Sequence, residues 1–122
     1  MPPLEFNIIK QYFSNITNKE NSAGIHMGVG DDAAIVSIPE NKNLVVCTDT
    51  LNEDVHFPLN TSAYDIAYKA LAVNLSDLAA MGALPKWFTL NISLPGVNED
   101  WLADFTKGLK QLADEYQLNL IG

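Results

Sequence analysis

The sequence predicts an α/β sandwich, in which helices pack on one face of a mixed β-sheet. Stretches with helical periodicity alternate along the chain with short β-branched or alternating apolar runs. Their order is helix, two strands, long helix, strand, long helix and the start of a further strand, which suits helices layered on a sheet. With 122 residues, of which 48% are hydrophobic, the chain is long enough for one domain with its own core.

The first half of the chain contains one predicted helix and two predicted strands. Residues 4–13 predict a short amphipathic helix. Three bulky apolar side chains stand there at helical spacing: Phe6, Ile9 and Phe13. Residues 33–38 form an apolar run that Pro39 ends, which is typical of a strand. The β-branched run 44–48 predicts a second, buried strand, and residues 49–60 follow it as a long acidic connection.

A long helix and a strand are predicted in the middle of the chain. Ser62 can cap the helix, with Asp65 three places on as an acidic variant of the capping box. The helix runs toward Met81, and Gly82 favours its end there. The following stretch, "WFTLNISL", alternates cleanly and predicts a strand with two distinct faces.

The two faces of this strand differ in character. Phe88 lies on the face that we expect to meet the helices, and Trp87 lies on the opposite face. A half-apolar outer face that carries an aromatic ring is often buried in a dimer. Ordinary scatter of apolar residues on a surface explains Trp87 equally well at this point.

The last part of the chain predicts a second long helix, which starts near Asn98. Its apolar stripe consists of Trp101, Leu102, Phe105, Leu109, Leu112 and Tyr116. The ending "LNLIG" looks like the opening of another strand. Because natural domains rarely stop one residue beyond a strand-like run, we expect the chain to be part of a longer protein.

Charge and composition narrow the classes of partner. The net charge of −8 repels nucleic acid and anionic membranes, so we expect neither as a partner. All seven basic residues are lysines, so the bidentate guanidinium fork for phosphate is absent. No apolar run approaches the roughly 20 residues of a membrane span. Cys47 is the one cysteine, which fits a reducing compartment, and we expect a cytoplasmic location.

Acidic residues at the ends of predicted elements are the first candidates for a site. Asp49 directly follows the run 44–48, and residues just past the end of a strand often hold ligands in α/β folds. Thr48 adds a hydroxyl oxygen, and Mg²⁺ prefers such hard oxygen ligands. The pair Asp31 and Asp32 in "GVGDDAAIV" is either a corner of a cation site or, as is commoner for Gly-Asp turns, a solvated turn.

The predicted helix from Ser62 carries a second polar feature. Asn74 and Asp77 are three positions apart, so both side chains point in the same direction. A carboxylate among so many alanines is costly to desolvate unless it is paired or bound to a metal. An exposed polar stripe on an amphipathic helix is the simpler explanation of the same pattern.

Other polar residues also have a plain structural explanation. His56 can bind a phosphate, but a single histidine in a loop is more often structural or solvated. Surface solvation accounts for Lys69, and Cys47 reads as an inert thiol within a strand. The two glycines of "GVGDD" are not followed by Lys and Ser or Thr, so this is not a P-loop. No zinc-ligand spacing or hydrolase elbow is present.

Taken together, the motifs are far more specific than any one of them. "GVGDDAAIV", "TDTLNEDVHF" and "YKALAVNLSDLAAMGALPKW", followed by the terminal "LIG", resemble the thiamine-monophosphate kinase family. This family belongs to the superfamily of aminoimidazole ribonucleotide synthetase. The resemblance covers nearly the whole chain, from "LEFNIIKQYF" onward.

The resemblance implies a function and an architecture. Members transfer the γ-phosphoryl group of ATP to thiamine monophosphate and use magnesium ions held by aspartates. It implies that residues 1–122 are the N-terminal domain, that a C-terminal domain is absent from this chain, and that N-terminal domains pair into a homodimer with a barrel-like interface. The isolated piece is then expected to have little or no kinase activity.

The resemblance also implies roles for single residues. By motif, the metal ligands are Asp32, Thr48, Asp49 and Asp77. His56 matches a position near the thiamine monophosphate, and Thr106 lies near a position that touches nucleotide. Two positions depart from the family pattern. Asp54 stands where glycine is common, and an aspartate tolerates a positive φ better than most residues if the position needs one. Cys47 stands where a residue with a hydroxyl group is usual.

Two other functions stay open on the sequence alone. The chain can serve only as a dimerisation module, without chemistry of its own. It can also belong to a different ATP-using enzyme of the same superfamily. The absence of an early reactive Cys motif argues against selenophosphate synthesis.

Overall fold

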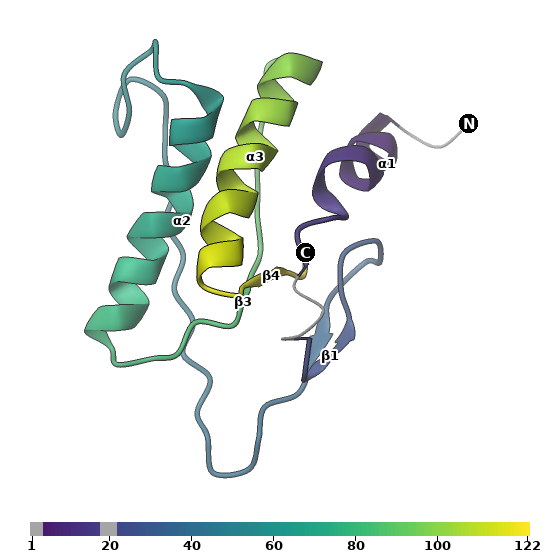
Figure 1. Ribbon diagram of the computed structural model, residues 1–122, viewed down its shortest axis with the longest axis vertical. Coiled ribbons are helices and arrows are strands. Elements are labelled where there is room, and N and C mark those ends of the chain that lie inside the picture. Colours follow the sequence, from purple (N-terminus) through teal and green to yellow (C-terminus); the bar gives the residue numbers. More distant parts are fainter. Residues whose placement is uncertain (1–3, 18–21) are drawn as a thin grey trace.

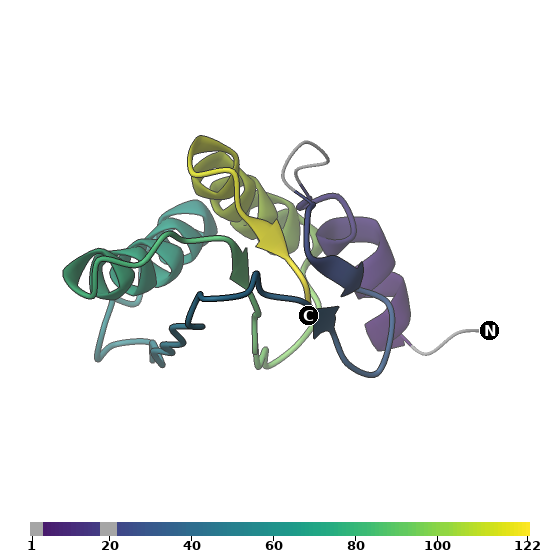
Figure 2. The ribbon, with the colours of Figure 1, turned by 90° about the horizontal axis from the view of Figure 1, so that it is seen from below.

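The computed structural model describes residues 4–17 and 22–122 (Figure 1). Its elements, in chain order, are α1 (Leu4–Ile8), the wider π-helical turn η1 (Ile9–Phe13), β1 (Ile25–Met27), β2 (Ile35–Val36), α2 (Ala63–Ala80), β3 (Trp87–Phe88), α3 (Glu99–Glu115) and β4 (Asn119–Leu120). Figure 2 shows α2 and α3 on one side of β3, β4 and the extended chain that follows β2. The predicted mixture of helices over strands is therefore confirmed, although the strands are shorter than predicted.

Both long helices begin where the sequence predicts, and α2 also ends where it predicts. The Ser62 hydroxyl accepts a hydrogen bond from the Asp65 N–H at 3.1 Å and caps α2. The Asn98 side chain accepts one from the Trp101 N–H at 3.0 Å and caps α3. Gly82 has φ +66°, and the next residue, Ala83, closes the end of α2 through its N–H. Short polar caps and a glycine thus fix the helix ends, as the chemistry of exposed backbone groups requires.

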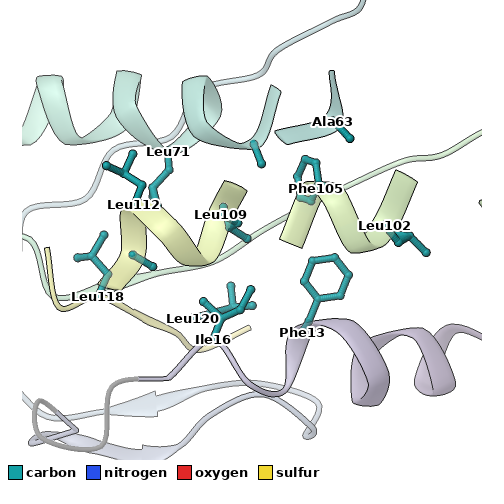
Figure 3. Packing of buried hydrophobic residues seen from close by; sticks show 12 residues of the cluster. Phe13, Ile16, Ala63, Leu71, Leu102, Phe105, Leu109, Leu112, Leu118 and Leu120 are labelled. Carbon is teal, nitrogen blue, oxygen red and sulfur yellow. The ribbon is translucent and has the colours of Figure 1, made fainter. Parts of the chain in front are cut away.

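The apolar stripe of α3 forms the centre of the core, as predicted, except at its last residue. Leu102, Phe105, Leu109 and Leu112 are buried, whereas Tyr116 is 49% exposed. Tyr116 is the C-cap of α3, so its backbone has already left the helical path that aligns the stripe. Figure 3 shows α3 between α2 on one side and Phe13 on the other.

Helices α2 and α3 approach each other closely at Gly108. A Cβ atom at this position would lie 2.3 Å from the Tyr64 carbonyl oxygen, so only glycine fits. The Asp104 carboxylate accepts the Tyr64 N–H at 3.0 Å, which satisfies a free donor in the first turn of α2. The contact between these helices therefore combines close backbone packing with a polar tie.

The N-terminal helix is only partly amphipathic. Phe13 is buried and its ring meets that of Phe105 edge-on at 6.4 Å. Phe6 is 58% exposed, so this predicted member of the apolar face does not pack on the core. The change from α1 to the wider turns of η1 alters the angular spacing of side chains, which separates Phe6 from Phe13.

Two small sheets replace the single predicted sheet. Strands β1 and β2 pair antiparallel, and β3 and β4 pair parallel, with Trp87 opposite Asn119 and Phe88 opposite Leu120. Further hydrogen bonds extend the second pair, because the Leu90 N–H donates to the Gly122 carbonyl at 3.0 Å. The predicted strand at "LNLIG" is therefore confirmed, and Phe88 packs against the core as expected.

The predicted buried strand at residues 44–48 is wrong for this structure. The run is extended, but no strand pairing is found for it within the described residues. Leu44 is 53% exposed and Val46 is 77% exposed. A β-branched run becomes a strand only where a neighbouring strand accepts its backbone hydrogen bonds and buries its side chains. The predicted strand 33–38 is likewise reduced to Ile35–Val36.

Candidate functional site

The connection between β2 and α2 runs along α2 in the opposite direction. Cys47 lies beside Asn74 in the second half of α2, and His56 lies beside Lys69 in the first half. Figure 1 shows this connection rising past α2 to a loop beside the first turns of that helix. Residues from the acidic connection and from α2 are thereby brought together along one edge of the molecule.

Cys47 is the meeting point of the predicted acidic residues. Its Sγ lies 3.6 Å from both the backbone oxygen and the side-chain Oδ1 of Asn74. Partial burial, and then the carboxylates of Asp77 and Asp49, raise the pKa of the Cys47 thiol. The charges of Asp49 and Asp77, which are far apart in the chain, thus both act on this one thiol.

The raised pKa also settles the state of the thiol. At neutral pH a thiol with a raised pKa stays protonated and is a poor nucleophile. The Asn74 side chain is held in turn, because its Nδ2 donates to the Ala70 carbonyl at 2.9 Å. The reading of Cys47 as an inert thiol is consistent with both observations, but its surroundings are polar rather than those of a buried strand.

Asp32 does not join this group in the structure. It is exposed on the turn between β1 and β2, which Gly30 makes possible with φ +112°. Across residues 4–17 and 22–122, no three His, Cys, Asp or Glu side chains lie close enough together to hold a metal ion. Asp49 and Asp77 both influence Cys47, whereas Asp32 lies on a separate turn, and the metal roles of all three carboxylates stay predictions.

A large groove adjoins the converging residues. It has a volume of about 1000 Å³ and lies between residues 44–53, α2 and residues 85–98. Thr48, Asp49 and Asn74 line it, whereas His56 and Asp77 do not. The predicted ligands Thr48 and Asp49 therefore face a space large enough for a ligand or for another polypeptide segment.

His56 is part of a tightly bonded loop. Its Nδ1 accepts the Asn52 N–H at 2.8 Å, and its own N–H donates to the Asn52 carbonyl at 2.9 Å. Asp54 has φ +61°, and its N–H donates to the Phe57 carbonyl at 2.8 Å. Asp54 therefore stands at a position with positive φ, the condition under which an aspartate is expected to replace the common glycine with only a local change. Because Nδ1 is an acceptor, the neutral ring carries its proton on the exposed Nε2.

Thr106 is separate from the other predicted residues. Its hydroxyl donates to the Leu102 carbonyl at 2.9 Å, within α3, and it does not line the groove. Its role toward a nucleotide stays a prediction.

Two contacts of this region could not be read from the sequence. Lys69 donates a hydrogen bond to the His56 carbonyl, and Cys47 contacts Asn74. Neither pair has a characteristic spacing, because each contact depends on how a long connection folds back on α2.

In the described part of the chain, no helix is long and apolar enough to cross a membrane.

Comparisons with known proteins place these residues in context. Residues 30–122 match the family model described as AIR synthase related protein, N-terminal domain. The chain is 47% identical over 118 residues to the thiamine-monophosphate kinase of Haemophilus influenzae. This alignment covers 97% of this chain and 35% of that protein. The enzyme of the same name from Escherichia coli K12 is 47% identical and is covered to 36%.

A solved structure gives the same picture. The crystal structure of thiamine-monophosphate kinase from Stenotrophomonas maltophilia superposes with a TM-score of 0.74 at 55% sequence identity. The match covers 80% of this chain and 31% of that one. The chain thus spans about a third of the length of the curated relatives that it matches.

Proposed function

The chain belongs to the family of AIR synthase related proteins, whose N-terminal domain it carries, and from this premise we propose that it is the N-terminal domain of a thiamine-monophosphate kinase. The observation that carries the proposal is the 47% identity to kinases of that name across 97% of the chain. In this proposal a C-terminal domain follows residues 1–122, and the complete protein works in the cytoplasm.

The proposed reaction sets a demand for positive charge. The enzyme transfers the γ-phosphoryl group of ATP to the phosphate of thiamine monophosphate, and both reactants are anions. Phosphoryl transfer depends mainly on positioning and on neutralising charge. The chain itself has a net charge of −8 and no arginine, so it cannot neutralise the phosphates alone. Bound cations, or another segment of the complete protein, must therefore supply positive charge.

The residues around Cys47 suit an open magnesium site. Asp49 and Asp77 offer two carboxylates, Thr48 offers a hydroxyl, and all three are hard oxygen ligands. In the described part of the chain the one ion pair is Lys110–Asp114, so neither carboxylate is neutralised by a lysine. Mg²⁺ typically uses one or two carboxylates together with substrate phosphates, and when bound it would neutralise and align them.

His56 is the proposed contact to the acceptor substrate. The loop holds its ring through Nδ1, which leaves Nε2–H exposed as a donor to a phosphate oxygen. Lys69 and Asp77 are eight positions apart on α2, so His56 and the acidic pair lie roughly 12 Å apart along the helix axis. This separation leaves room for the phosphates of two reactants between them.

The proposal includes a homodimer with a barrel-like interface, and the exposed extended run at residues 44–48 supports this part of it. Val46 and its neighbours expose apolar side chains along an extended run that pairs with no strand of the described residues. The Trp87 indole N–H is buried within the chain and has no hydrogen-bond partner among the described residues, so the exposed run alone supports this part of the proposal. An extended run of this kind is suited to pairing with a second polypeptide.

A kinase assay of the full-length protein with two aspartate variants tests the proposal. With ATP, Mg²⁺ and thiamine monophosphate, we expect the wild type to form thiamine diphosphate. Asp49→Ala and Asp77→Ala should each lower kcat by about 100-fold or more, because charge stabilisation of this kind contributes several kcal/mol. Asp114→Ala, which removes an equal charge from the exposed pair on α3, should leave kcat unchanged.

Each outcome has a definite meaning. Absence of thiamine diphosphate with the wild type would refute the proposed activity. Normal kcat in both Asp49→Ala and Asp77→Ala would remove the metal roles. The 122-residue chain alone should show little turnover, and robust turnover would contradict the need for a second domain.

A further inference from the structure

The loop of residues 52–57 is bonded mainly to itself. The Asn52 carbonyl accepts the N–H groups of Val55 and His56, at 3.2 and 2.9 Å, and the His56 ring accepts the Asn52 N–H. Glu53 and Phe57 form an isolated bridge that closes the loop at its base. These bonds fix the shape of the loop, but they do not fix where it sits relative to the rest of the molecule.

Lys69 provides the polar link between this loop and α2. Its Nζ donates a hydrogen bond to the His56 carbonyl oxygen. Within residues 4–17 and 22–122 it makes no ion pair, although the chain has 15 acidic residues. A lysine on a strongly acidic protein that contacts a loop carbonyl instead of a carboxylate is placed to hold that loop.

The same helix carries the acidic part of the site. Asn74 and Asp77 follow Lys69 on α2, and the Asn74 Oδ1 lies 3.6 Å from the Cys47 Sγ, two positions before Asp49 in the connection. The connection thus contacts α2 through Cys47 to Asn74 and through His56 to Lys69. The second contact sets the distance between the His56 ring and the pair of carboxylates.

We propose that Lys69 is a positioning residue that holds His56 at a fixed distance from Asp49 and Asp77 through its bond to the His56 carbonyl. The proposal rests on the proposed function, because His56 acts there as the contact to thiamine monophosphate. Lys69 acts through the loop and does not itself touch the substrate. Its loss should therefore weaken the binding of the acceptor and leave the binding of ATP intact.

Kinetics of the full-length protein form the first part of the test. Lys69→Met keeps the length of the side chain and removes the donor, whereas Lys69→Arg keeps a charged donor. We expect Lys69→Met to raise the KM for thiamine monophosphate about tenfold, the usual effect of losing a charged hydrogen bond, with the KM for ATP unchanged. Lys69→Arg should restore most of the affinity. Lys107→Met, on the exposed surface of α3, is the matched control and should change nothing.

The kinetic results separate positioning from a general structural role. A rise of both KM values together with a lower melting temperature in Lys69→Met would overturn the proposal, because it would show a loss of fold. Unchanged KM for thiamine monophosphate in Lys69→Met would overturn it as well. So would a Lys69→Arg variant that is no better than Lys69→Met.

NMR of the 122-residue chain forms the second part and does not require kinase activity. In Lys69→Met, the amide signals of residues 52–57 and the ring nitrogens of His56 should shift or broaden, while the signals of core residues such as Leu102 and Leu109 stay in place. Unchanged loop signals would overturn the positioning role. If the wild type forms no thiamine diphosphate, the proposed function fails, and this spectrum still decides whether Lys69 holds the loop.

Discussion

The pair of long helices and the connection that leads into it differ sharply in how they are held. Between α2 and α3, side chains are buried and backbones touch, as at Leu102, which is 0% exposed, and at Gly108. Along the connection, residues 44–50 are extended and mostly exposed, and no strand pairing is found for them within the described residues. One region carries the stability of the molecule, and the other carries most of its candidate site.

This difference has a physical cause. A helix satisfies its own backbone hydrogen bonds, so α2 and α3 need only bury one face each against the other. An extended run must find its hydrogen bonds on a neighbouring strand. The groove between residues 44–53 and 85–98 lies where such a neighbour would fit. The candidate site therefore sits on the part of the molecule that is least constrained by internal packing.

The difference in packing between the helix pair and residues 44–50 can be tested by removing one apolar side chain from each region. Leu109→Ala should lower the free energy of unfolding by about 4 kcal/mol, because Leu109 is buried at the centre of α3 and leaves a cavity. Val46→Ala should change it by less than about 0.5 kcal/mol, because Val46 is exposed. Urea unfolding followed by circular dichroism measures both. Equal losses would show that residues 44–50 are part of the same packed core.

The close approach of α2 and α3 can be tested by adding an atom instead. In Gly108→Ala, the new Cβ meets the backbone of Tyr64, which cannot turn aside as a side chain can. We expect a loss of about 2–3 kcal/mol, typical of an overfilled contact. Gly96→Ala is the matched control, because a Cβ there has no neighbour within 4 Å. A Gly108→Ala variant as stable as the wild type would mean that the helices are farther apart than described.

The sequence predicted the helical region well for the same reason that it is stable. Ser62, Asn98 and Gly82 act within a few residues of the helix ends, so local chemistry alone determines those ends. The stripe of α3 was also readable, because its period belongs to the helix itself. Only Tyr116 fell outside it, where the helix had already ended.

The connection was harder to predict because its structure depends on distant partners. The run at residues 44–48 has the composition of a strand, but composition does not supply a neighbour. On α2, the spacing of Asn74 and Asp77 predicted that they point together, and their meeting with Cys47 is consistent with it. The contact of Lys69 with the His56 loop left no trace in the sequence, because no local rule relates two residues on separate elements.

The smallest expected effect concerns the pH dependence of the Cys47 thiol. It reports whether the connection before α2 is ordered, as the pair of long helices is. Burial and the charges of Asp77 and Asp49 raise the pKa of this thiol in the folded chain. The stability that it contributes is therefore fully present below the pKa of the unfolded chain and is lost as the pH rises through the folded pKa. Alkylation by iodoacetamide should need a higher pH in the folded chain than in urea.

Charge variants show which carboxylates act on this thiol. Asp77→Asn should move the alkylation profile toward lower pH, because it removes a negative charge that disfavours the thiolate. Asp114→Asn, which removes an equal charge far along α3, should leave the profile in place. The same profile in all three proteins would mean that Asp77 does not lie near Cys47 in solution. The acidic residues would then be solvated separately, and the connection would lack the order that a shared cation site requires.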